Sequence, residues 1–147
     1  MPRCLIALIC VFVLQFSTAS CQDKNWKLLG TTTDDIECYV SIKNIIKKKT
    51  SAIVWNKFLF DPKSIEKMRL KSRPDLNFEP YNKVIVKKIT DFKNNRAKTL
   101  SSRYYLNGII VHELEINEKE AIWYDIIPDS EEDAELVFLK KYLHIKN

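Results

Sequence analysis

Few side chains in this sequence have the types and spacing that catalysis or metal binding needs. The only histidines are His112 and His144, and neither has a histidine, cysteine or carboxylate at the spacing of a metal site. His112 could form an acid–base site with Glu113 and Glu115, but neighbouring strand residues point to opposite faces, so His112 and Glu113 diverge. No serine lies in a nucleophile elbow. We therefore predict a non-enzymatic protein with no catalytic residue, metal or cofactor.

The cysteines offer a different chemistry. Cys21 follows a run of small residues, and this context resembles a bacterial lipobox, in which the cysteine is acylated, although Thr18 stands where leucine is usual. Alternatively, Cys21 pairs with Cys38 in a disulfide, which an oxidising compartment allows. We keep both hypotheses. If Cys21 is acylated, Cys38 is predicted to be an inert buried thiol in a strand.

The N-terminal residues have the order of a secretory signal. Arg3 is the only charge before Asp23, residues 5–16 are almost purely apolar, and a run of small residues follows. This apolar stretch is shorter than the roughly 20 residues that a membrane span needs. The alternative to a cleaved signal is a short N-terminal membrane anchor that is retained. We therefore expect residues 1–20 to be a signal peptide and 21–147 to be one exported domain. Its expected location is the outer membrane or cell surface as a lipoprotein, or alternatively the periplasm or the medium.

The charge of the chain is basic, but its pattern does not indicate a nucleic-acid partner. There are 24 Lys and Arg residues against 19 Asp and Glu residues, which gives a net charge of +5. The lysines are scattered among acids, and an exported protein rarely meets nucleic acid. The lysine run at 47–49 is predicted to be a solvated turn, with attraction to an anionic lipid or polysaccharide surface as the alternative. Gly30 and Gly108 are too few to form a glycine-rich phosphate loop.

Period-two patterns and turn signals predict a series of antiparallel strands. Both faces of 52–60 are mostly apolar, which indicates a central, well-covered strand. Asn107 and Gly108 tolerate positive φ and predict a type I′ turn. Because strands joined by tight turns are antiparallel, we expect a meander. The expected strands are 36–40, 52–60, 81–92, 96–106, 109–116 and 121–127.

Two helices are expected. Asp61 and Pro62 could open a short helix of about one turn within a long, polar and basic connection to Pro80. A C-terminal helix is predicted to begin at the acids 131–133, which fit a capped first turn better than a calcium site. Ser130 or Asp129 is its expected cap. The stripe expected to face the sheet comprises Ala134, Val137, Phe138 and Lys141, widened by Leu136, Leu139, Tyr142 and Leu143.

These elements predict an α+β domain. It has a single antiparallel meander sheet of about five to seven strands with the C-terminal helix packed on one face, because an antiparallel sheet must cover an apolar face. Trp26, Trp55 and Trp123 are expected to be core or edge aromatics, with an exposed strip for carbohydrate or peptide as the alternative. Open sheet edges would also allow dimerisation.

Four segments in this order resemble the surface-adhesin protein E family of small exported bacterial proteins. They are 26–30, 38–45 followed by 52–55, 93–108 and 123–130. The resemblance implies an antiparallel sheet with a C-terminal helix, a lipoprotein or periplasmic protein, and binding to host proteins. Family members often carry two cysteines that tie this helix to the sheet. Here Phe92 and 136–143 offer none, so the helix is expected to be held by burial alone.

Together these observations favour a non-enzymatic, exported envelope protein, anchored to a membrane by lipid if Cys21 is acylated. It is expected to bind a host, matrix or envelope protein through a sheet edge or the basic segment 63–73. The alternative is a periplasmic accessory protein without adhesin activity, which adds a strand to a partner.

Overall fold

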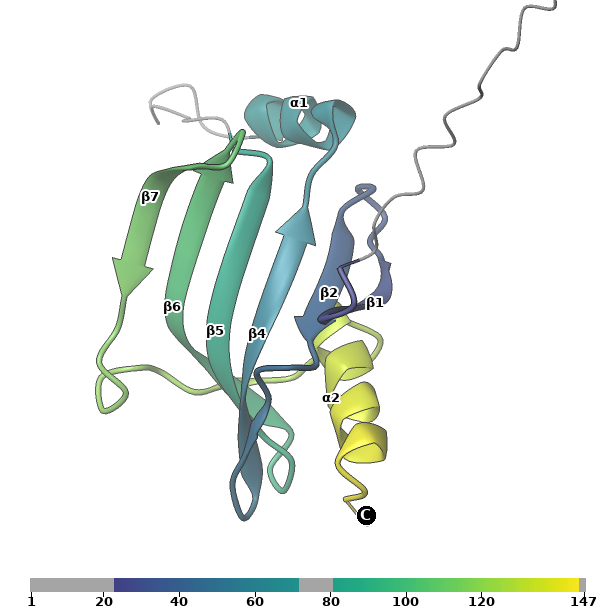
Figure 1. Ribbon diagram of the computed structural model, residues 1–147, viewed down its shortest axis with the longest axis vertical. Coiled ribbons are helices and arrows are strands. Elements are labelled where there is room, and N and C mark those ends of the chain that lie inside the picture. Colours follow the sequence, from purple (N-terminus) through teal and green to yellow (C-terminus); the bar gives the residue numbers. More distant parts are fainter. Residues whose placement is uncertain (1–22, 72–80, 146–147) are drawn as a thin grey trace, which may run out of the picture.

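The computed structural model describes residues 23–71 and 81–145 (Figure 1). The predicted signal peptide at 1–20 and Cys21 lie outside these residues, as does the end of the segment 63–73. Six strands form the main path of one antiparallel sheet, in the order β1-β2-β4-β5-β6-β7. They are β1 (Trp26–Thr31), β2 (Glu37–Ser41), β4 (Ser51–Leu59), β5 (Lys83–Asp91), β6 (Arg96–Leu106) and β7 (Ile109–Glu115).

The remaining elements lie around this sheet. The two-residue strand β3 (Ile46–Lys47) pairs with β4, and β8 (Tyr124–Asp125) pairs with β6. The helix α1 (Pro62–Lys71) lies at one end of the sheet, and α2 (Glu131–Tyr142) lies beside β1 and β2 (Figure 1). Strands along the main path follow the chain order, so the predicted α+β meander is confirmed.

Local signals set the turns and helix starts. Asn107 (φ 50°) and Gly108 (φ 87°) both adopt the left-handed conformation that a type I′ turn requires. The N–H of Ser64 donates to Asp61 Oδ1 at 2.6 Å, so Asp61 caps α1 as expected. However, α1 has 10 residues and is therefore longer than the single turn predicted.

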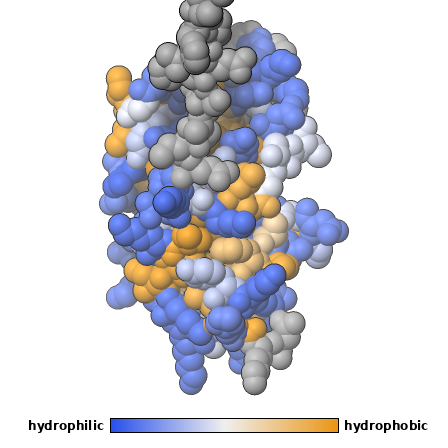
Figure 2. Space-filling model, turned by 45° about the vertical axis from the view of Figure 1, so that its right-hand side comes forward, coloured by the Kyte–Doolittle hydropathy of each residue, from blue (hydrophilic) through white to orange (hydrophobic). Residues whose placement is uncertain are grey.

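We call the face of the sheet that α2 covers the inner face, and the opposite one the outer face. The core lies between the inner face and α2, with Val40, Ala52 and Val54 from the sheet packed against Leu136 and Leu139. Seen from the side of α2 and β1, apolar side chains form an area bordered by polar ones (Figure 2). The exposed apolar residues of these two elements include Leu28 and Val137.

The predicted apolar stripe of α2 is partly wrong. Leu136 and Leu139 are buried, but Ala134 is exposed and Val137 is 61% exposed. Glu135, which is 1% exposed, faces the sheet instead of these two residues. Apolar residues lie on more than one side of this helix, so their spacing alone could not fix which side faces the sheet.

The predicted strand 121–127 is also mostly wrong, since only Tyr124 and Asp125 pair with β6. Ala121 packs against Ile89 and Leu100, which belong to a separate apolar cluster, whereas Ile126 packs into the core under α2. The segment must therefore pass from one cluster to the other, and a straight strand cannot do so.

Candidate functional site

The outer face of the sheet carries aromatic side chains with lysines beside them. Trp55 of β4 is opposite Lys87 of β5, and Lys83 of β5 is opposite Tyr105 of β6. Because strand residues alternate between faces, these side chains point away from the core that Val54 lines. We call the following set the lysine–aromatic strip: Trp26, Tyr39, Trp55, Tyr105, Lys57, Lys83 and Lys87.

Each lysine of this strip lies over at least one aromatic ring. Lys57 Nζ is 4.7 Å from the ring centroid of Trp26 and 4.6 Å from that of Tyr39. Lys83 Nζ is 4.2 Å from Tyr105, and Lys87 Nζ is 5.3 Å from Trp55. These separations are within the range of cation–π attraction, which is worth about 0.5–1 kcal/mol at an exposed site.

The strip lysines form no close ion pair among the described residues, although the charges of Asp23 and Glu37 act on Lys57 and Glu37 accepts a hydrogen bond from Tyr39 at 2.8 Å. Within residues 23–71 and 81–145, no carboxylate forms an ion pair with Lys57, Lys83 or Lys87. Burial lowers the pKa of Lys57, and the charge of Asp23 partly offsets that effect. An aromatic platform with unpaired ammonium groups suits a ligand that has an apolar body and negative charge.

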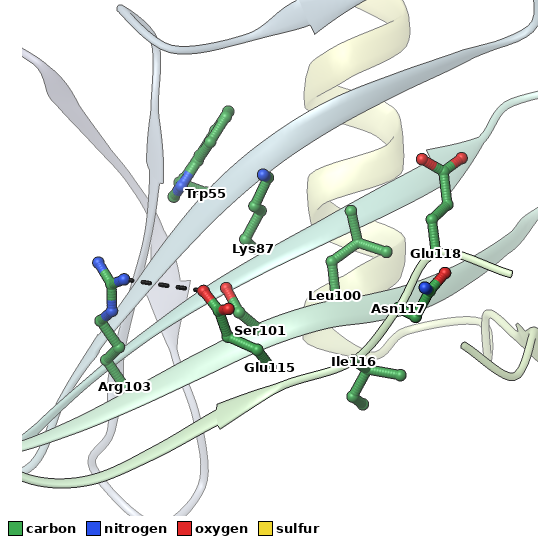
Figure 3. A pocket seen from close by; sticks show the side chains of 9 residues that line it. All are labelled: Trp55, Lys87, Leu100, Ser101, Arg103, Glu115, Ile116, Asn117 and Glu118. Carbon is green, nitrogen blue, oxygen red and sulfur yellow. Dashed lines mark ion pairs between the residues drawn. The ribbon is translucent and has the colours of Figure 1, made fainter. Parts of the chain in front are cut away.

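A pocket of about 480 Å³ adjoins the strip on the outer face (Figure 3). Trp55 and Lys87 lie on one side of it, and Glu115 at the end of β7 lies on the other (Figure 3). Arg103 Nη2 is 4.0 Å from Glu115 Oε1, and Arg103 also pairs with Glu113. The remaining lining residues are Leu100, Ser101, Ile116, Asn117 and Glu118.

The rim beyond β7 is fixed by contacts to the sheet. The N–H of Ile116 donates to the carbonyl oxygen of Leu100 at 2.8 Å. Lys98 Nζ donates to the carbonyl oxygen of Glu118 at 2.7 Å, and Lys48 Nζ lies 3.8 Å from Glu118 Oε1. The segment after β7 that lines the pocket is therefore fixed to the sheet by hydrogen bonds and an ion pair.

A second polar cluster lies on the inner face, where α2 covers it. Lys88 Nζ is 3.2 Å from Glu135 Oε2, and both residues are buried. Thr90 Oγ1 donates to Glu135 Oε1 at 2.9 Å, and the side-chain amide of Asn56 donates to Glu135 Oε2. Among the described residues, Asn56 Oδ1 has no hydrogen-bond partner. We infer that this cluster fastens α2 to the sheet, which corrects the expectation that burial alone holds the helix.

Burial and charge act on Lys88 in opposite directions. Burial lowers the pKa of Lys88, but the negative charge of Glu135 raises it, and the net result is a raised pKa. The amine therefore stays charged at neutral pH. Sequence analysis missed this pair, although Lys88 shares the alternating positions of Val84 and Val86 and is the only lysine among them. A lysine in an otherwise inward-facing pattern signals a buried partner.

Cys38 lies in β2 on the inner face and is 3% exposed. Burial, followed by the charges of Glu131 and Glu132, raises the pKa of its thiol to about 12. The thiol thus stays protonated at neutral pH, and its predicted burial is confirmed. Because Cys21 lies outside the described residues, its acylation and its disulfide with Cys38 both stay predictions.

The histidines and the acidic helix start are placed as expected. His112 packs against Tyr104, with ring centroids 5.5 Å apart, whereas Glu113 pairs with Arg103 on the outer face. His144 is exposed just beyond α2. Ser130, not Asp129, caps α2, because its side chain accepts from the N–H of Asp133 at 3.2 Å. In the part of the chain that the structure describes, no cluster of His, Cys, Asp and Glu could hold a metal ion.

The tryptophans are half-buried on the outer side. Trp26 and Trp55 belong to the strip but are only partly exposed, and the alternative of an exposed strip for carbohydrate or peptide stays a prediction. Trp123 lies just before β8, with Arg96 and Lys98 at 4.5 and 4.8 Å from its ring centroid. It packs against the cluster of Ile89 and Leu100 and therefore fits the expected core or edge role.

Comparison of the chain with protein-family models, with curated proteins and with solved structures found no match. Neither helix within residues 23–71 and 81–145 is long and apolar enough to cross a membrane.

Proposed function

We propose that this chain is an exported, non-enzymatic binding domain of the surface-adhesin E type. Its outer sheet face attaches to an acidic surface of a host, matrix or envelope protein. The lysine–aromatic strip carries the proposal, because three ammonium groups lie over aromatic rings and none of them forms an ion pair with a carboxylate of residues 23–71 or 81–145. Aromatic anchors supply contact area, and the positive charge favours a partner of opposite sign. The signal-like N-terminus and the family resemblance support export and adhesion.

The strip is a stronger candidate than the basic segment 63–73 that the sequence suggested. Lys67 of α1 already has a carboxylate partner, because its Nζ lies 3.4 Å from Asp35 Oδ2. The positive charge of Lys67 is thus partly compensated by Asp35 within the domain. The strip lysines have no such partner among the described residues, so their charge is available to a ligand.

Replacing the three strip lysines by glutamine is expected to weaken binding to immobilised poly-L-glutamate, a stand-in for an acidic protein surface. The variant Lys57→Gln, Lys83→Gln, Lys87→Gln should lose about tenfold to a hundredfold in affinity, because each lost charge is worth roughly 0.5–1 kcal/mol. Surface plasmon resonance on the mature protein at low salt measures this loss.

A matched control separates position from net charge. The variant Lys49→Gln, Lys93→Gln, Lys141→Gln removes the same charge at exposed positions of two turns and the end of α2, none of which pairs with a strand residue of the strip. It should change the affinity by less than about threefold, through the weaker long-range field alone. Equal losses in both variants would show that only net charge matters, and would reject the strip as the binding site.

Intact mass spectrometry of the protein from its native membranes is expected to give residues 21–147 carrying diacylglycerol and acyl groups on Cys21. The lipobox-like run of small residues before Cys21 supports acylation over the competing disulfide with Cys38. An unmodified chain that is two hydrogens lighter than calculated would instead establish the Cys21–Cys38 disulfide.

Protease treatment of intact cells should remove a surface adhesin and spare a periplasmic accessory protein.

A further inference from the structure

We propose that the outer pocket beside Trp55 binds a neutral pyranose sugar residue. The proposal goes beyond attachment to an acidic protein, because it concerns the chemistry of the pocket rather than the charge of the strip. It rests on one combination of features: an aromatic wall, an apolar floor, and a rim that carries both signs of charge.

The wall and the floor suit the C–H face of a sugar ring. Trp55 is half-buried and borders the pocket (Figure 3), and Lys87 Nζ lies 5.3 Å from its ring centroid, so a sugar ring would pack on the part of the indole that the ammonium leaves uncovered. Leu100 and Ile116 add apolar surface, and both belong to or pack against the second apolar cluster. A pyranose presents axial C–H groups on one face, and such groups pack on an aromatic ring as other apolar groups do. The volume of about 480 Å³ lies in the usual range of small-ligand sites.

The rim selects against simple ions. Lys87 and Arg103 would repel a cation, whereas Glu115 and Glu118 would repel an anion. A neutral sugar avoids both penalties, because each hydroxyl can donate to a carboxylate and accept from an ammonium or guanidinium group. Glu115 is well placed for this role, since its side chain is 74% exposed and only 4.0 Å from Arg103.

Glu115 also separates this proposal from the one on acidic partners. Replacing Glu115 with alanine removes a hydrogen-bond acceptor from the sugar, so sugar binding should weaken. The same change removes a negative charge beside the strip, so binding to poly-L-glutamate should be unchanged or stronger. Either proposal can thus fail while the other stands. Because the Glu115 side chain is exposed, its replacement should change the stability of the fold by less than about 0.5 kcal/mol.

The test is a titration of the mature protein with methyl glucoside, galactoside and mannoside, followed through the three tryptophan indole N–H signals by NMR. We expect one sugar to shift the Trp55 signal saturably, with a Kd of about 1–10 mM. The signal is assigned with Trp55→Phe. Glu115→Ala should weaken this sugar by about fivefold or more, the effect of one lost charged hydrogen bond. Val137→Ala, on α2 and outside both the pocket and the strip, should leave the affinity unchanged.

Three results would overturn the proposal. The first is the absence of a saturable shift with every neutral sugar up to about 100 mM, far above the expected Kd. The second is tighter binding of glucuronate than of methyl glucoside, which would assign the pocket to anions. The third is a sugar affinity that Glu115→Ala leaves unchanged.

Discussion

Replacing Glu135 with leucine is expected to lower the free energy of unfolding by about 3–5 kcal/mol, because it leaves Lys88 charged, buried and unpaired. Lys88 is 4% exposed, and its amine faces Glu135 Oε2 at 3.2 Å. Thr90 and Asn56 would also lose the carboxylate that accepts their hydrogen bonds. The loss is large against the total of roughly 5–15 kcal/mol for a domain of this size. Urea denaturation followed by circular dichroism measures it.

The double variant Lys88→Met, Glu135→Leu should recover most of this loss. Two apolar side chains of similar volume remove the unpaired charge, and such replacements are neutral or stabilising by about 1–4 kcal/mol in other buried pairs. A double variant no more stable than Glu135→Leu would contradict the pairing of these two residues. The exposed pair of Lys67 and Asp35 is the control, and Lys67→Met should cost less than about 1 kcal/mol.

The pH dependence follows from the raised pKa of Lys88. A lysine whose pKa is higher in the folded than in the unfolded chain stabilises the fold at every pH below its unfolded value of 10.5. That contribution falls only as the pH rises above 10.5 and towards the folded pKa. The stability of the native chain relative to the double variant Lys88→Met, Glu135→Leu, which leaves neither group unpaired, should therefore stay constant across neutral pH and fall only in strong alkali.

Replacing Leu139 with alanine is expected to lower the free energy of unfolding by about 2–5 kcal/mol. Leu139 is 0% exposed and packs in the core beneath α2, next to Val40 and Val54. The change removes buried apolar surface and leaves a cavity that the sheet cannot close. Urea or thermal denaturation of the purified variant provides the measurement.

Val137→Ala is the matched control for this change. Val137 lies on the same helix but is 61% exposed, so the effect should be within about 0.5 kcal/mol. The comparison also tests the orientation of α2. If Val137→Ala were as damaging as Leu139→Ala, the helix would dock through the stripe that the sequence pattern predicted.

The elements set by local chemistry were predictable from the sequence. The pair Asn107 and Gly108 predicted a two-residue turn between strands, and a series of such connections can only give an antiparallel meander. Ser130 and the acids after it located the start of α2. In each case the signal and the structure involve residues within a few positions of one another, so no distant contact could override them.

The rotation of α2 and the path of 121–127 were decided by tertiary structure. Glu135 faces inward because it forms an ion pair with Lys88 of β5, which is far away in the sequence. Ala121 and Ile126 belong to different apolar clusters, which local alternation cannot reveal.

The candidate site was also decided by tertiary structure. The sequence contained the tryptophans and lysines, but only the register of the strands places Trp55 beside Lys87 and leaves both on the uncovered face. A one-residue shift of register would have turned every such side chain to the other face. The sequence by itself therefore determined the elements and their order. Contacts between residues far apart in the chain decided which side chains became core and which became surface, because burial depends on partners that local patterns do not contain.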